Sequence, residues 1–405
     1  MSEAPQRQQN LVRSAGKASG AVFLSRISGL VREVVMAHFF GASLVYDAFT
    51  VGFRIPNLTR DLFAEGALSS AFVPIFTQKL KNENKEAAFR LANLVATALI
   101  LVVGVMCAIG VFAAPLIMEW LGDGFHSVPG KFELAVQLTR IMFPFLLLVA
   151  LAAQAMGVLN ALNIYGVPAP SSSFFNVGSV AMGLLLGFVA GPHIGLTPME
   201  GMAWGVVFGG ALQLAWQVPS LRRAGFRFRP QLDFSDPGVR QIMRLMGPAI
   251  LGNAAVQINV MVNTNFAADI NDAVRGPNGP VAWLGYAFRF MQLPLGLFGV
   301  AIATATLPAI SRSAASGDFD DFRLTLSRSV GLVFLLTIPS SIGLALLGPS
   351  MIGAIYQGGK FDAYDTQQAG VALSYFAIGL AGYSALKVLT PAFYALGDSR
   401  TPMVI

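Results

Sequence analysis

One long charge-free run constrains the fold of this chain more than any other feature: Ile141–Met199 contains no Asp, Glu, Lys or Arg. Its length accommodates two membrane spans of about 20 residues each. Only 12% of the 405 residues are charged and 55% are hydrophobic, whereas about 25% of the residues in an ordinary soluble domain are charged. The sequence therefore predicts an all-α polytopic membrane protein.

Shorter charge-free runs, rich in Gly and Pro as packed membrane helices are, continue this pattern along the chain. They predict ten complete spans and the start of an eleventh: 18–40, 45–78, 88–120, 132–162, 171–190, 198–221, 238–268, 281–311, 322–347 and 367–396, with 401–405 beginning the next. We expect no cleavable signal peptide in the polar first twenty residues, so the first helix would itself direct insertion.

The distribution of Lys and Arg between the spans predicts the orientation. One set of alternate connections carries nearly all of them, namely the N-terminal tail, 79–90, 222–244, 312–328 and Arg400. The other set holds only Lys131, Arg275 and Lys360. Because short cytoplasmic connections are enriched in positive charge, we expect the N-terminus to be cytoplasmic.

An internal repeat predicts two copies of one helical bundle. Prolines 74, 115 and 168 recur 234 positions later as prolines 308, 349 and 402, and Phe89-Arg90-Leu91 recurs as Phe322-Arg323-Leu324. Six spans separate equivalent helices, so both copies would have the same orientation and be related by a pseudo-twofold axis along the membrane normal.

The predicted organisation follows from the repeat: a cytoplasmic tail (1–17), an N-lobe of six helices (18–222), a cytoplasmic linker (223–237) and a partial C-lobe (238–405). Two full periods would need more residues than the chain has. We therefore expect the second copy to be C-terminally incomplete.

Charged residues inside the first two spans mark the candidate site, because each costs several kcal/mol in the bilayer unless it faces a polar cavity or another charge. An excess of guanidinium groups suits a phosphate or pyrophosphate, since each donates two parallel hydrogen bonds. The expected substrate-binding residues are Arg26, Arg32, Arg60 and Arg289. The candidate gating or ion-pair residues are Asp47, Arg54, Asp61, Glu65 and Lys387.

Structural alternatives remain open for several of these residues. Arg54 and Asp61 lie near one helical face and could form a clamp. Arg289 could form a salt bridge at the bundle seam. Lys387 and Arg140 are long enough to reach toward an interface.

Other chemistries are not supported by the residue pattern. The net charge of +6 is not gathered into a basic, aromatic-interleaved patch of the nucleic-acid-binding kind. His38, His126 and His193 lack metal-ligand spacing, and Cys107 stands alone in an apolar run. We expect no catalytic residue, no metal site and no nucleic-acid partner.

Several motifs together resemble those of the MurJ (MviN) lipid II flippase family, a branch of the multidrug/oligosaccharidyl-lipid/polysaccharide exporter superfamily. They are Ser25-Arg26 with Gly29 and Arg32, Phe40-Gly41-Ala42, Asp47-Ala48-Phe49, Pro56-Asn57-Leu58 with Arg60, 63–67, 71–74, 246–252, Tyr286-Ala287 with Arg289, and Gly299-Val300-Ala301. The resemblance covers essentially the whole chain.

This resemblance implies a fourteen-helix transporter of alternating access, with two six-helix lobes and two further helices beside a lipid groove. Arg26, Arg32, Arg60 and Arg289 match cavity positions of the family, with the implied role of capturing the lipid II pyrophosphate, and Asp47 matches an acidic position. The chain departs from relatives at Phe288 and Gln292, where they often carry Asp and Glu, which puts in doubt any gate built on those carboxylates.

The implied function is translocation of lipid II, the undecaprenyl-pyrophosphate-linked muropeptide of peptidoglycan biosynthesis, across the bacterial cytoplasmic (inner) membrane. No enzyme activity and no cofactor are expected; coupling to the membrane potential or to a monovalent cation is open. Membrane lipid is the expected surrounding partner, and the sequence indicates no protein partner. The alternatives are a cation or drug antiporter, an exporter of another polyprenyl-linked oligosaccharide, and a non-transporting scaffold or sugar-modifying enzyme.

Overall fold

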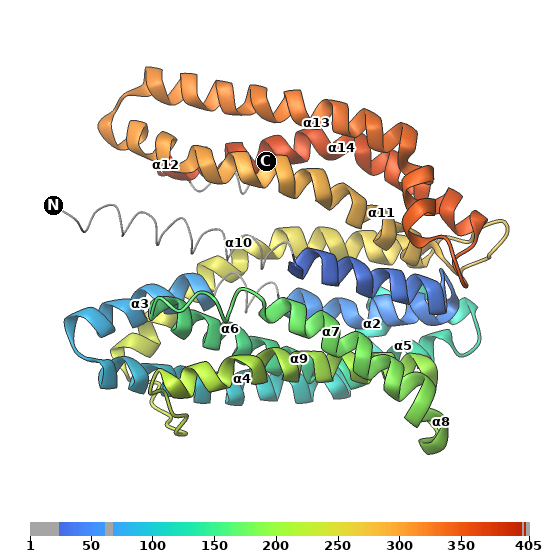
Figure 1. Ribbon diagram of the computed structural model, residues 1–405, viewed down its shortest axis with the longest axis horizontal. Helices are drawn as coiled ribbons and strands as arrows, with labels where there is room; N and C mark the ends of the chain where they lie inside the picture. The colour runs from blue at the N-terminus through green and yellow to red at the C-terminus, as the bar shows by residue number, and fades with distance from the viewer. Residues whose placement is uncertain (1–23, 61–67, 399–400, 402–405) are drawn as a thin grey trace. The chain divides into compact units, whose positions relative to one another are not determined.

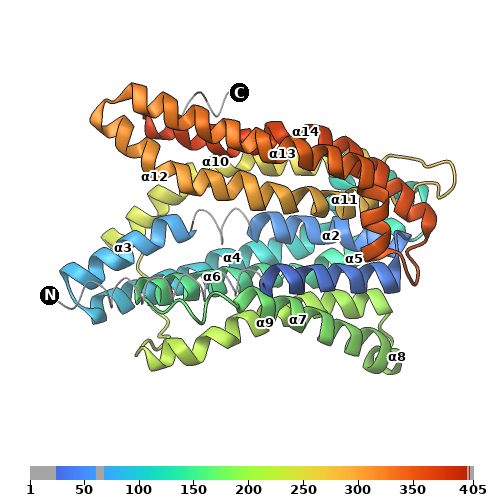
Figure 2. The ribbon, with the colours of Figure 1, turned by 45° about the horizontal axis from the view of Figure 1, so that its top comes forward.

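The described chain is built from helices (Figures 1 and 2). The computed structural model describes residues 24–60, 68–398 and 401, and within them the side chains other than those at 59–60, 69–70 and 248–256. A first helix occupies residues 24–40. It is followed by α2 (Leu44–Arg60), α3 (Leu68–Asn82), α4 (Lys85–Leu121), η2 (Asp123–Ser127), α5 (Lys131–Met142), α6 (Phe145–Ala161), α7 (Ser171–Leu184), η3 (Leu185–Ala190), α8 (Gly191–Ile194), α9 (Pro198–Arg223), α10 (Pro237–Ala268), α11 (Pro280–Pro294), η4 (Leu295–Val300), α12 (Ala301–Ser316), α13 (Phe319–Tyr356) and α14 (Ala363–Ala395).

Each of the ten predicted spans corresponds to one helix or to consecutive helices. Six of the described helical segments are long and apolar enough to cross a membrane: Lys85–Leu121, Lys131–Ala161, Ser171–Ile194, Pro280–Ser316, Phe319–Tyr356 and Ala363–Ala395. The prediction was wrong at the end of the ninth span, where α13 continues past Leu347 to Tyr356. Pro349 lies inside that helix. A proline in a membrane helix removes one backbone hydrogen bond but need not end the helix.

Contacts along the chain define two units, each described by itself. The first consists of the chain up to Val35 together with Leu44–Pro277, and the second of Met36–Ser43 together with the chain from Asn278 onward. Helix α10 belongs to the first unit because it packs against α3 and α4. This division differs from the predicted lobes, whose boundaries and pseudo-twofold relation stay a prediction.

Glycines allow two helices of the first unit to pack backbone against backbone. Helices α7 and α9 lie side by side (Figure 2), and α9 presents Gly201, Gly205 and Gly209 at four-residue intervals, hence along one face. A Cβ added at Gly209 would lie 2.6 Å from the carbonyl oxygen of Phe175, and one at Gly205 would overlap that of Ser179. Such small-residue faces permit close approach where the bilayer offers no hydrophobic driving force between helices.

Replacing Gly205 by leucine is expected to force α7 and α9 apart and to destabilise the first unit by about 1–3 kcal/mol, the usual cost of overpacking. The measurement is the thermal unfolding midpoint of the purified protein in detergent. Gly104 in α4 provides the matched control, because a Cβ there meets no atom within 4 Å. Equal midpoints for Gly205→Leu and Gly104→Leu would contradict this account of the interface.

The second unit is centred on α13 and α14, which lie side by side (Figures 1 and 2). Buried aromatic side chains join them to α11: the Tyr286 ring lies 4.8 Å from that of Tyr356 and 5.1 Å from that of Phe361. Near the start of α14, buried Asp365 accepts a hydrogen bond of 3.0 Å from Trp283 Nε1. The polar pair thus fixes the start of α14 against α11.

Candidate functional site

The first helix carries two of the predicted arginines and is anchored to α7 by polar side chains. Asn176 Nδ2 in α7 donates to Ser28 Oγ at 3.1 Å and to the Ser25 carbonyl oxygen at 3.3 Å. A Cβ at Gly29 would lie 3.5 Å from the same amide. Because residues four apart share a helical face, Arg32 follows Ser28 on the side that faces α7.

Arg32 is held by its surroundings on that side. Its guanidinium carbon lies 5.5 Å from the centre of the Phe175 ring, a cation–π arrangement. Its Nη2 donates to Glu33 Oε1 at 3.0 Å, and Tyr46 Oη donates to Glu33 Oε2 at 3.1 Å. An anion approaching Arg32 would meet a positioned guanidinium group whose charge Glu33 already partly compensates.

Arg26 differs from Arg32 in being exposed. The two lie six positions apart, so on a helix their side chains project about 120° from each other. Among the described residues, Arg26 makes no ion pair. Arg26 is therefore the more accessible of the two candidate anion ligands on this helix.

Asp47 forms a deeply buried ion pair with Lys131. Lys131 Nζ lies 3.0 Å from Asp47 Oδ2, and the two side chains are 0% and 1% exposed. The ammonium also donates to the Pro277 carbonyl oxygen at 2.7 Å and lies 4.2 Å from the centre of the Phe125 ring. One cation thereby joins the starts of α2 and α5 to the segment after α10.

The sequence pattern placed Lys131 in a connection between two spans and indicated no functional or structural role for it. The internal repeat carried a usable signal. Asp47 is the fourth residue of α2, and Trp283 is the fourth residue of α11; Lys131 and Asp365 lie in the first turns of α5 and α14. A buried polar pair therefore joins equivalent helices in each copy of the repeat. It is the ion pair Lys131–Asp47 between α5 and α2 in the first copy, and the hydrogen bond from Trp283 to Asp365 between α11 and α14 in the second.

The remaining predicted residues of the first two spans are only partly described. Arg54 is half-buried in α2, two residues before Pro56. Arg60 is the last residue of α2, and its side chain lies outside the described residues, as do Asp61 and Glu65. The proposed Arg54–Asp61 pair and the role of Arg60 therefore stay predictions.

Arg289 and Lys387 belong to the second unit. Arg289 is exposed on α11, and Lys387 Nζ lies 5.1 Å from the centre of the Tyr383 ring, one turn earlier in α14. Phe288, next to Arg289, packs against Phe376 with ring centres 5.7 Å apart. This aromatic contact joins α11 to α14.

A family model described as "Lipid II flippase MurJ" matches residues 36–405 of the chain. The chain belongs to this family. Its similar relatives include the lipid II flippase MurJ of Burkholderia cenocepacia, 36% identical over 98% of this chain and 75% of that protein. A probable lipid II flippase MurJ of Vibrio cholerae is also 36% identical, over 98% of this chain and 74% of that protein.

Solved structures agree with the MurJ assignment. A lipid II flippase MurJ in an inward closed conformation superposes with a TM-score of 0.78 at 27% identity, covering 96% of this chain and 77% of that one. An inward-facing MATE-family multidrug transporter of the MOP superfamily superposes with a TM-score of 0.75 at 12% identity, covering 94% and 83%, which shows a shared fold. The predicted family and the all-α polytopic membrane class are confirmed. The MurJ family consists of lipid flippases, hence of transporters and not enzymes, in the bacterial inner membrane.

Proposed function

We propose that this chain translocates lipid II across the inner membrane by alternating access, with arginine side chains holding the pyrophosphate. Membership of the lipid II flippase MurJ family over residues 36–405 carries the proposal. Alternating access fits the fold, because members of the same superfamily that superpose on the chain include inward-facing and outward-facing transporters.

Arg26 is the first contact in the proposed binding step, because it is exposed and free of ion pairs among the described residues. Arg32 would contribute a second guanidinium group by exchanging Glu33 for a phosphoryl oxygen, a substitution of one charge-assisted bond for another. Arg60 and Arg289 complete the proposed set. The polyprenyl chain would stay in the lipid beside the protein.

The position of Asp47 weighs against the alternative of a cation or drug antiporter. Such a transporter needs a carboxylate that a cation can reach, whereas Asp47 is buried and already neutralised by Lys131. We also propose that transport uses no bound cofactor and draws on the membrane potential or a monovalent cation gradient. A coupling cation would drive the conformational change only if it bound the two states with different affinities.

The proposed function is tested in a bacterium depleted of its own flippase and supplied with the complete reading frame of this protein. We expect growth to be restored and lipid II to become accessible to a membrane-impermeant reagent added outside the cells. Efflux of a cationic dye without growth rescue would favour the antiporter. Chemical modification of the lipid II headgroup without translocation would overturn the proposal in favour of an enzyme.

A further inference from the structure

The connection between α9 and α10 is an extended segment held against α4. The side chain of Asn93 in α4 donates to the Arg227 carbonyl oxygen at 3.3 Å and accepts from the Arg229 backbone N–H at 2.9 Å. One turn further along α4, Thr97 Oγ1 accepts from the Gln231 backbone N–H at 3.1 Å. Backbone groups at 227, 229 and 231 are thus bound at two-residue intervals, as an extended chain allows.

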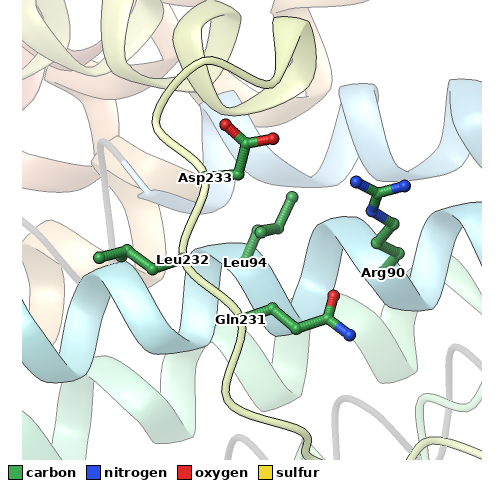
Figure 3. A pocket seen from close by; sticks show the side chains of 5 residues that line it. All are labelled: Arg90, Leu94, Gln231, Leu232 and Asp233. Carbon is green, nitrogen blue, oxygen red and sulfur yellow. The ribbon is translucent and has the colours of Figure 1, made fainter.

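A pocket of about 490 Å³ lies between this segment and α4. Arg90 and Leu94 line it from α4, and Gln231, Leu232 and Asp233 line it from the connection (Figure 3). Figure 3 shows the Arg90 guanidinium group and the Asp233 carboxylate on either side of Leu94. The pocket therefore combines a cation, an anion and apolar side chains.

The two charges of the pocket do not neutralise each other. Among the described residues, Arg90 forms no ion pair, and Asp233 Oδ1 accepts only the Ser235 backbone N–H, at 2.9 Å. That backbone bond fixes the carboxylate in place. Both charged groups are therefore available to a ligand that carries complementary charges.

The pocket lies at the edge of a membrane-spanning segment. Its Arg90 directly precedes the charge-free run that begins at Leu91, within the candidate span Lys85–Leu121. Leu94 is about 6 Å further along the helix axis. Apolar side chains of the connection are exposed beside it, with Leu232 at 52% and Phe228 at 48%. Long arginine side chains near the ends of membrane helices extend to the level of the lipid headgroups.

The opposite charges of Arg90 and Asp233 favour one kind of lipid headgroup over others. A purely anionic headgroup would be repelled by Asp233, and a simple cation by Arg90. A phosphoethanolamine group carries a phosphate for Arg90 and an ammonium for Asp233, two carbons apart. Its acyl chains would lie along Leu94 and the exposed Leu232.

We propose that the hollow between α4 and the α9–α10 connection is a binding site for the headgroup of a zwitterionic aminophospholipid. The phosphate is bound by Arg90 and the ammonium by Asp233, with the Gln231 amide as a further polar contact. All of these residues belong to the first unit, and none of them is among the proposed ligands of the lipid II pyrophosphate. Its occupant ties the connection between α9 and α10 to the surrounding leaflet.

The test is competition between phosphatidylethanolamine and phosphatidylglycerol with matched acyl chains, added in equal amounts to the purified protein in detergent and counted by native mass spectrometry. We expect the wild-type protein to retain phosphatidylethanolamine about tenfold more than phosphatidylglycerol, the ratio that one charge-assisted contact provides. Arg90→Gln should lower retention of both lipids. Asp233→Asn should remove the preference by lowering phosphatidylethanolamine and raising phosphatidylglycerol.

The internal repeat supplies a matched control. Arg323 follows Phe322 in α13 as Arg90 follows Phe89 in α4, and it is likewise exposed but lines no part of the pocket. Arg323→Gln should leave the lipid ratio unchanged. Because the ratio is measured within one sample, it does not depend on the folded fraction of a variant. A wild-type preference for phosphatidylglycerol, or equal ratios for wild type and Asp233→Asn, would overturn the proposal.

Discussion

Replacing Arg26 by alanine is expected to abolish growth rescue in a flippase-depleted bacterium while leaving membrane insertion intact. Arg26 is exposed on the first helix and makes no ion pair among the described residues, so its removal leaves no buried charge behind. A lost charge-assisted contact to a phosphoryl group costs about 1.5–3 kcal/mol, or roughly ten- to hundredfold in affinity. The measurements are growth and the translocation of lipid II in cells matched for protein level.

Two further variants separate binding by Arg26 from a general effect on charge. Arg26→Lys keeps the charge but loses the two parallel donors, so it should restore translocation only in part. Arg328, exposed on α13, provides a control whose alanine variant should translocate normally. Full rescue by Arg26→Ala would refute the role of Arg26 in holding the pyrophosphate.

Arg32 should respond differently from Arg26 because it also has structural partners. Its alanine variant would remove the ion pair with Glu33 and the cation–π contact with Phe175. Thermal stability and transport should therefore fall together in Arg32→Ala, whereas only transport falls in Arg26→Ala.

Replacing Lys131 by methionine is expected to destabilise the protein by about 3–5 kcal/mol, the usual cost of breaking a buried ion pair by removing one member. Asp47, whose side chain is 1% exposed, would lose its ion pair with Lys131, and the Pro277 carbonyl oxygen would lose the hydrogen bond from the ammonium group. The thermal unfolding midpoint of the purified protein and its level in the membrane should both fall steeply.

The double variant Asp47→Leu with Lys131→Met tests the origin of that loss. Removing both charges should recover most of the stability lost in Lys131→Met, because neither apolar side chain leaves an unpaired charge. Lys79 and Glu83 form an exposed pair at 3.4 Å, and Lys79→Met should cost only about 0.3–0.5 kcal/mol. A Lys131→Met variant no less stable than Lys79→Met would refute the structural role of the buried pair.

The sequence predicted the positions and order of the helical segments because that signal is local. A stretch such as Leu91–Met118 is apolar whatever its neighbours are, and it appears in the structure as the main part of α4. Family membership was equally accessible, since its motifs are read along the chain. Span ends were less predictable: the ninth span was expected to end at Leu347, whereas the helix continues to Tyr356.

Contacts between residues far apart in the sequence could not be predicted from local sequence patterns. Asp47 was singled out as a candidate for an ion pair, but the residues around it did not indicate its partner Lys131, which lies 84 positions away. The roles of the α9 glycines and of the polar side chains Asn93 and Thr97 likewise became apparent only from the segments that pack against them.

The sequence by itself thus determined the class, the spans, the repeat and the arginine-rich first helix of this protein, because apolar length and intramembrane charge constrain a chain locally. The tertiary structure decided how those charges are used: Arg32 is tied to Glu33, Asp47 is neutralised by Lys131, and Arg26 stays exposed. The physical reason is that the cost of a charge depends on its partners and burial, which only the packing of distant segments sets.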